Sequence, residues 1–179
     1  MDFYVIINMS DTEYDEPKKK HPLDALPKSK MSLDALKRGY NDHKKTDKKY
    51  FLSKPFGEEF DDIGYSLYRS DYKHNGDFTG RADFVNRNSV NGMVQSLDDA
   101  RKYAFGTLSI LDVDGEKKQI VGYWILRGSQ PIKDVFDDFL DDNVWTQLTP
   151  SKETYEKLNE AFYGDKVNGF DVEHRSVFL

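Results

Sequence analysis

The stretch PLDALPKSKMSLDALKRGYN, Pro22 to Asn41, contains the tetrapeptide LDAL twice. The first copy lies between Pro22 and Pro27. Proline disfavours helix in the residue before it and has no N–H to donate. We therefore expect Leu23 and Leu26 to be extended apolar anchors on the surface of the domain.

The second copy follows Ser32, and serine is a good helix N-cap. Met31 before the cap and Leu36 in the first turns are placed to form a hydrophobic staple. Gly39 or Asn41 is expected to end the helix. The same four letters therefore predict two conformations because their flanks differ, and together they mark the start of the folded domain.

Upstream of this stretch, residues 10–22 read SDTEYDEPKKKHP, a polar and charged composition typical of a linker. We predict a tail and linker over residues 1–21 and a single domain over residues 22–179. The apolar run Phe3–Met9 is far shorter than the ~20 residues of a membrane-spanning helix and lacks the features of a signal peptide. We therefore expect a soluble, intracellular protein that resides in the cytoplasm.

The fold class follows from the order of the elements downstream. Asp114-Gly115 between two apolar segments is a strong hairpin signal. The expected strands are Ile63–Lys73, Thr79–Asn86 after a turn at Asn75-Gly76, Tyr103–Leu111, Gln119–Arg127 and Thr146–Leu148. The expected helices are Asn88–Ala104, Pro131–Leu140 and Ser151–Tyr163, and a short helix or turn is expected within residues 48–60. The apolar carboxyl terminus is expected to pack back on the body. Hairpins and helices without βαβ alternation predict an α+β domain with an antiparallel sheet.

Catalytic signals are few. There is no cysteine, which excludes disulfides, thiolate metal sites and cysteine nucleophiles. The four histidines have no metal-ligand spacing, and the acidic run Asp134–Asp142 is interpreted as a solvated helix face. Gly122 beside Trp124 predicts close approach of a bulky group, with a neighbouring helix as the favoured explanation. We predict no catalytic residue, no cofactor and no metal, and hence no enzyme.

Charge is distributed unevenly along the chain. Residues 17–50 hold eleven Lys/Arg and four Asp/Glu, whereas the whole chain has a net charge of -6. Basic residues beside aromatics can bind single-stranded RNA, and a basic segment can attach to an anionic membrane. The overall acidity argues against RNA binding as the main role. A module that binds RNA or a membrane surface through the basic segment 18–49 remains the alternative.

The opening stretch resembles the start of the C-terminal domain of the gamma subunit of translation elongation factor 1. The matching positions are Leu26, Pro27, Lys28, Ser29, Leu33, Asp34, Lys37, Arg38, Tyr40 and Asn41. The likeness continues through Gly64–Tyr68 and Tyr72, where the family's tryptophans are tyrosines, and through Gly92-Met93, Gln95, Leu97, Arg101, Ala104-Phe105, Gly122, Trp124, Arg127, Gly128, Trp145 and Leu148. Ser96 departs from the basic residue that the family leads us to expect.

The resemblance implies an antiparallel, about five-stranded sheet flanked by helices, with a concave face. It also implies a non-catalytic scaffold module of the elongation factor 1 complex, which supports guanine-nucleotide exchange on the GTPase that delivers aminoacyl-tRNA. Other subunits of that complex, and aminoacyl-tRNA synthetases, are the implied partners, with no small-molecule substrate. An enzyme that uses the concave face is the rival hypothesis. The candidate partner-binding residues are Lys28, Lys37, Arg38, Tyr40, Arg101 and Arg127.

Overall fold

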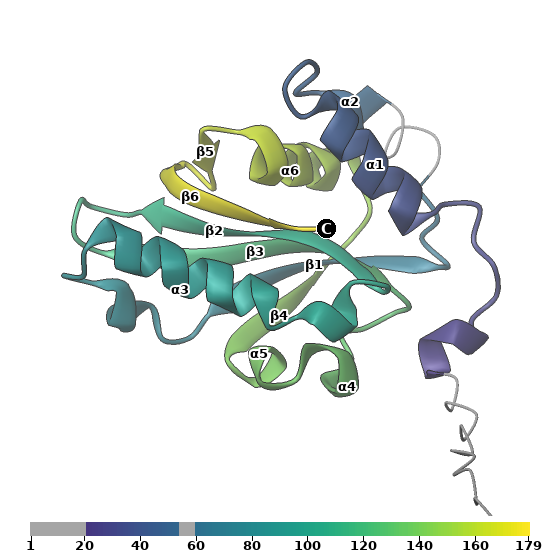
Figure 1. Cartoon of the computed structure of the whole chain (residues 1–179). Coiled ribbons are helices and arrows are strands. Elements are labelled where there is room, and N and C mark those ends of the chain that lie inside the picture. Colours follow the sequence, from purple (N-terminus) through teal and green to yellow (C-terminus); the bar gives the residue numbers. More distant parts are fainter. Residues whose placement is uncertain (1–20, 54–59) are drawn as a thin grey trace, which may run out of the picture.

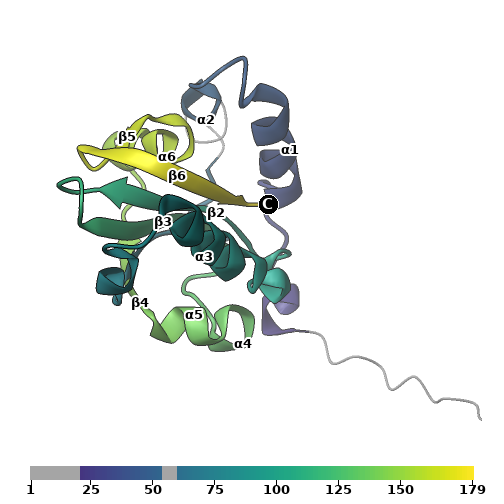
Figure 2. The same ribbon diagram turned by 60° about the vertical axis from the view of Figure 1, so that its left-hand side comes forward.

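The computed structural model describes residues 21–53 and 60–179. This part of the chain forms one antiparallel sheet in the order β4-β1-β3-β2-β6-β5, with α1, α2 and α6 on one face and α3, α4 and α5 on the other (Figure 1). The sheet is twisted and curled like an opened barrel (Figure 2). The prediction of a single α+β domain with an antiparallel sheet is confirmed. The sheet has six strands, of which β5 is only two residues long, where the resemblance implied about five.

The strands are β1 (Tyr65–Tyr72), β2 (Ala104–Asp112), β3 (Lys118–Arg127), β4 (Asn143–Leu148), β5 (Lys166–Val167) and β6 (Phe170–Phe178). The α-helices are α1 (Leu33–His43), α2 (Tyr50–Ser53), α3 (Asp83–Gln95), α4 (Lys133–Phe136), α5 (Asp138–Asp141) and α6 (Lys152–Tyr163). The 3-10 helices in the described part of the chain are η1 (Pro22–Ala25), η2 (Asn75–Phe78) and η3 (Asp98–Ala100). The predicted tail and linker over residues 1–21 lie, apart from His21, outside the described residues.

The first LDAL is not extended, and this prediction was wrong for Leu23. Pro22 begins the 3-10 helix η1, where its fixed φ suits the first turn and its missing N–H costs no bond. The Leu23 N–H donates to His21 Nδ1 at 3.2 Å, and the Leu23 side chain is buried beneath the surface. Leu26, which precedes Pro27, is extended and exposed as expected.

The second LDAL begins α1 after Ser32, as predicted, and Ser32 Oγ accepts the N–H of Ala35 at 3.4 Å. Met31 and Leu36 are buried in the same hydrophobic cluster. The helix does not end at Gly39 or Asn41 but continues to His43. Gly39 therefore lies inside the helix. A Cβ at this position would come 2.5 Å from Tyr50 Cζ, so the glycine leaves room for α2 to approach α1.

The strand at Ile63–Lys73 and the hairpin at Asp114-Gly115 are confirmed as β1 and as β2–β3, with Gly115 at φ +85°. The expected return strand Thr79–Asn86 was wrong. Asn75 instead begins η2, and its side-chain oxygen accepts the N–H of Ile120 at 2.7 Å, which ties this turn to β3. The chain then enters α3, so β1 pairs with β3 and β4 and makes no local hairpin.

The long helix expected over Asn88–Ala104 starts earlier and ends earlier, as α3, and Ala82 is its N-cap. The acidic helix expected over Pro131–Leu140 is divided into α4 and α5 at Asp137, which has φ 47°. The expected short helix within residues 48–60, the strand over Thr146–Leu148 and the helix over Ser151–Tyr163 are present as α2, β4 and α6. The carboxyl terminus packs back as expected, as strand β6 beside β2.

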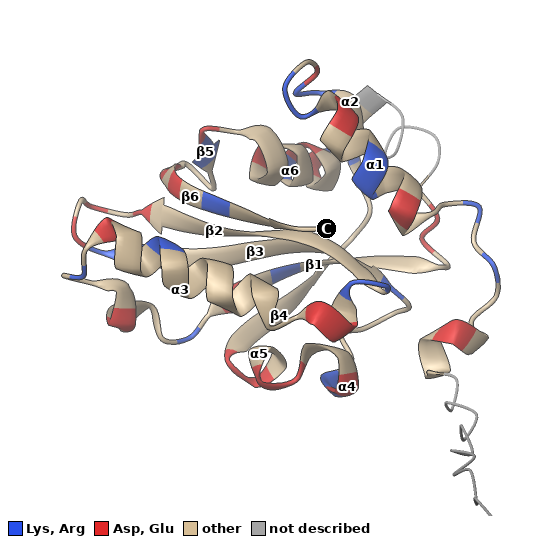
Figure 3. Cartoon of the chain, in the orientation of Figure 1, with Lys and Arg blue, Asp and Glu red and all other residues tan. Residues whose placement is uncertain are grey.

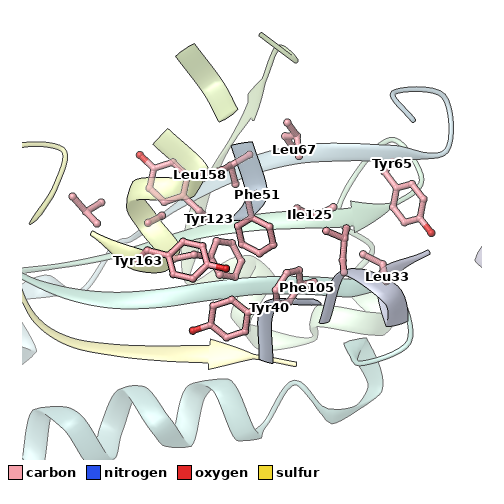
Figure 4. Packing of buried hydrophobic residues seen from close by; sticks show 14 of the residues in the cluster. Leu33, Tyr40, Phe51, Tyr65, Leu67, Phe105, Tyr123, Ile125, Leu158 and Tyr163 are labelled. Atoms are coloured by element: carbon pink, nitrogen blue, oxygen red, sulfur yellow. The ribbon is translucent and has the colours of Figure 1, made fainter. Parts of the chain in front are cut away.

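Each face of the sheet has its own hydrophobic cluster. On the face of α1, α2 and α6, aromatic rings such as Tyr40, Phe51 and Phe105 pack together (Figure 4). The ring centroid of Phe162 lies 4.9 Å from that of Phe51 and 4.7 Å from that of Phe105. Aromatic rings at these distances pack with favourable edge and tilted geometries. Helices therefore cover the sheet on both sides.

Trp124 organises the other face. Its side chain is fully buried, its Nε1 donates to Ser70 Oγ at 2.8 Å, and its ring meets the edges of Phe136 and Phe139 from α4 and α5. A Cβ at Gly122 would come 3.0 Å from Trp124 Cε2. The glycine thus makes room for the indole itself, and a neighbouring pair of short helices covers it, in line with the interpretation from sequence.

Candidate partner-binding surface

Apart from Tyr40, the candidate residues come from elements that lie at one end of the domain. The segment 22–32, helix α1, the turn 101–103 and the end of β3 lie together there, and lysines and arginines alternate with aspartates over this region (Figure 3). We call it the amino-terminal surface and define it by Lys28, Lys37, Arg38, Arg101, Lys102 and Arg127.

Lys37 and Arg101 come together although they are far apart in the sequence. Lys37 Nζ donates to the carbonyl oxygen of Arg101 at 2.5 Å. Both cations lie over the ring of Phe178, at 5.8 and 5.5 Å from its centroid. Burial lowers the pKa of Lys37, Asp34 opposes that shift, and Arg101 adds to it. The pair forms a cationic rim around the end of β6.

Arg127 acts as an internal clamp. Its guanidinium donates to the carbonyl oxygen of Gly64 at 2.5 Å and to that of Pro27, and it lies 5.2 Å from the ring centroid of Tyr65. These bonds hold the segment before α1 against the start of β1. The Arg127 guanidinium, which the sequence analysis assigned to contact with a partner protein, therefore already donates hydrogen bonds inside the domain.

A shallow pocket of 230 Å³ lies between η1, α1 and the turn 101–103. Lys102 Nζ pairs with Asp24 Oδ1 at 2.5 Å, and the Tyr103 hydroxyl donates to the same oxygen at 3.1 Å. The hydrogen bond from Lys102, chiefly, lowers the pKa of Asp24. Sequence reasoning missed Asp24, Lys102 and Tyr103, because Asp24 lies far along the chain from the other two. Only the position of Lys102 beside Arg101 gave a local signal.

The other three candidates differ in exposure. Lys28 and Arg38 are exposed, and neither side chain has a hydrogen-bond or ion-pair partner within residues 21–53 and 60–179. Tyr40 is buried, and its ring packs on Phe51 and Phe162 in the first hydrophobic cluster. The role of all six residues in partner binding stays a prediction.

The chemistry available on this surface is recognition rather than a metal centre. Among the described residues, no group of three His, Cys, Asp or Glu side chains could hold a metal ion. No helix in the described part of the chain has the length and apolar character needed to cross a bilayer. Exposed cations beside paired carboxylates suit an acidic or mixed-charge protein surface.

Known proteins resemble this chain over the same region. The family model "Elongation factor 1 gamma, conserved domain" matches residues 18–130, more than half of the chain. The chain is 38% identical over 145 residues to "Probable elongation factor 1-gamma 1" of Arabidopsis thaliana, which covers 80% of this chain and 34% of the relative. It is 38% identical over 148 residues to "Elongation factor 1-gamma 2" of Oryza sativa subsp. japonica, a match that covers 82% of this chain and 34% of the relative. It is 34% identical over 152 residues to "Elongation factor 1-gamma" of Drosophila melanogaster, a match that covers 83% of this chain and 33% of the relative.

These relatives define the class of protein, a translation elongation factor. The chain belongs to the elongation factor 1 gamma family, which confirms the resemblance seen in the sequence. It spans about a third of the length of the curated relatives that it matches.

Proposed function

We propose that the chain is a non-catalytic protein-binding module of the translation elongation factor 1 complex, and that it supports guanine-nucleotide exchange on the GTPase that delivers aminoacyl-tRNA. The observation that carries this proposal is the family match over residues 18–130, which includes all six candidate contact residues. Other subunits of the complex, and aminoacyl-tRNA synthetases, are the proposed partners. The cytoplasm is the proposed location.

The contacts of the amino-terminal surface favour a scaffold role. Arg127 clamps the segment before α1, and Asp24 is held by Lys102, so both groups stabilise the domain itself. Lys28 and Arg38 are exposed and without such partners in the described part of the chain. These two cations are therefore available to meet a partner, with Lys37 and Arg101 at the rim.

Affinity capture from cytosolic extract tests this proposal. The immobilised 179-residue chain is expected to retain elongation factor 1 subunits, identified and quantified by mass spectrometry. The double variant Lys28→Glu, Arg38→Glu should retain at least about fivefold less, because charge reversal at a rim weakens association. A matched control with the same change in net charge is Lys117→Glu, Lys152→Glu, whose side chains are 74% and 91% exposed elsewhere on the domain.

Two outcomes separate the function from the site. If the folded chain retains no elongation factor subunit, the proposed function is wrong. If it retains them and the Lys28, Arg38 variant behaves like its control, the function stands and the assignment of the contact surface is wrong.

A second candidate is attachment to RNA or to a membrane surface, favoured by the exposed lysines Lys44, Lys45, Lys48 and Lys49 between α1 and α2. Neutralising phosphates with lysines makes binding fall steeply with salt. Binding to single-stranded RNA, or to vesicles that contain phosphatidylserine, should weaken with rising salt and with Lys→Glu changes at these four positions. Binding that ignores salt would rule this candidate out.

A further inference from the structure

The sheet ends in two edges that differ in protection. At one edge, β6 carries Asp171, Glu173 and Arg175, and its pairing with β2 shifts register at a bulge. Part of this edge is covered by β5, and the Arg175 guanidinium donates to the carbonyl oxygen of Gly164. Charges, bulges and covering segments are the usual means by which proteins block pairing at a strand edge.

At the opposite edge, β4, none of these devices occurs within residues 21–53 and 60–179. Its sequence NVWTQL contains no charged residue and no proline, and it pairs with β1 without a register shift. Val144 is 53% exposed, and Thr146 and Gln147 are exposed as well. No hydrogen bond from residues 21–53 or 60–179 reaches the outer side of β4.

The register shows which backbone groups point outward. The Lys73 N–H donates to the Asp142 carbonyl at 3.0 Å, so these opposed residues form a hydrogen-bonded pair. Hydrogen-bonded pairs alternate along an antiparallel ladder. Val144 and Thr146 therefore turn their N–H and C=O groups toward β1. The N–H and C=O groups of Asn143, Trp145 and Gln147 point away from the sheet.

We propose that β4 pairs with β4 of a second copy of this chain, antiparallel and about a two-fold axis at Trp145. Asn143 then faces Gln147 of the second copy, and Trp145 faces its own equivalent. All three outward-facing residues enter hydrogen-bonded pairs, each of which exchanges two N–H···O bonds. This register uses every outward-facing backbone donor and acceptor of Asn143, Trp145 and Gln147. Two-fold contacts of one surface with itself are the commonest way for identical chains to associate.

The side chains fit the same register. Val144 lies opposite Thr146 of the second copy, and Thr146 lies opposite Val144 of the second copy. β-Branched residues therefore face each other on both sides of the axis. Asp142 lies opposite Leu148 of the second copy. The two Asp142 carboxylates are then about 20 Å apart along the strands, which exceeds the screening length of about 8 Å at physiological salt. Repulsion between these two carboxylates therefore does not oppose a second copy, and an uncharged strand offers no electrostatic selection for a charged partner segment.

One strand pair buries little surface, so the dimer is expected to be weak, with a dissociation constant of roughly tens to hundreds of micromolar. Sedimentation equilibrium of the full 179-residue chain tests this. The average mass should rise from 20.8 kDa toward twice that value between about 5 and about 500 µM. A constant mass of one chain over this range overturns the proposal.

Gln147→Pro is the decisive variant. Its N–H faces outward, so proline there removes a donor from the interface and none from the β1–β4 ladder, as edge strands tolerate. The dimer should weaken at least about tenfold. Gln147→Ala keeps the N–H and is the matched control. Its dimer should have a dissociation constant within about twofold of that of the unchanged chain. An undiminished dimer in folded Gln147→Pro overturns the proposal.

A charge pair tests the register even if Gln147→Pro does not fold. Val144→Lys, at an exposed position, should weaken the dimer, because it adds a protecting charge to the edge. Adding Thr146→Glu to the same chain places opposite charges across the axis at both symmetric positions and should restore the dimer. If the double variant dissociates as readily as Val144→Lys alone, β4 does not pair with itself in this register.

Discussion

The contact between Trp124 and the glycines of the sheet gives a prediction with a calculable size. In Gly106→Ala, the new Cβ would lie 2.8 Å from Trp124 Cδ2 and 2.8 Å from the Tyr123 carbonyl oxygen. The indole has no room to retreat, because it is fully buried and Phe136 and Phe139 close its far side. The backbone oxygen is fixed by the sheet.

Two effects add in this variant. Overpacking of a tight core costs about 1–3 kcal/mol. Displacing the indole also breaks its 2.8 Å hydrogen bond to Ser70 Oγ and leaves a buried donor unsatisfied, which costs about 1–3 kcal/mol more. We therefore expect Gly106→Ala to lower the free energy of unfolding by about 4 kcal/mol, a large share of the total of about 5–15 kcal/mol.

Urea unfolding at equilibrium, followed by tryptophan fluorescence and far-UV circular dichroism, measures this loss. The matched control is Gly92→Ala within α3, where a Cβ meets nothing within 4 Å. There the same substitution should raise stability by about 1 kcal/mol through helix propensity. A loss below about 1 kcal/mol in Gly106→Ala would show that the indole does not lie against Gly106 as described.

Three further predictions concern single contacts. Arg127→Ala should lower the free energy of unfolding by about 2 kcal/mol and speed amide exchange near Pro27, because its charged hydrogen bonds clamp that segment; hydrogen exchange with mass spectrometry measures it. Asp61 has a lowered pKa, chiefly because the Ser29 hydroxyl donates to it, so its contribution is present above the unfolded pKa of about 3.9 and is lost as pH falls through the lower folded pKa. The stability gap between the original chain and Asp61→Asn should thus narrow on acidification in urea titrations, and a constant gap would contradict this. Ser151→Ala should cost about 1 kcal/mol in thermal unfolding, because it removes the N-cap of α6.

Some parts of the candidate site were within reach of sequence reasoning and one was overlooked. Leu33, Leu36 and Tyr40 recur at helical spacing, a pattern that places all three on the buried face of α1. Tyr40 could therefore have been assigned to the core before its partners were known. Arg127 had no such signal, because its acceptors at Gly64 and Pro27 lie in distant segments.

Local chemistry settled what depends on neighbours in the chain. The serine cap before the second LDAL and the Asp-Gly tip of the β2–β3 hairpin needed only adjacent residues, since caps and tight turns are short-range structures. Tertiary structure decided the rest. Gly39 inside α1 leaves room for Tyr50, β1 takes β4 as its neighbour in place of a local return strand, and Lys37 meets Arg101 over Phe178. Each of these depends on contacts between residues far apart in the sequence, whose energies no local pattern contains.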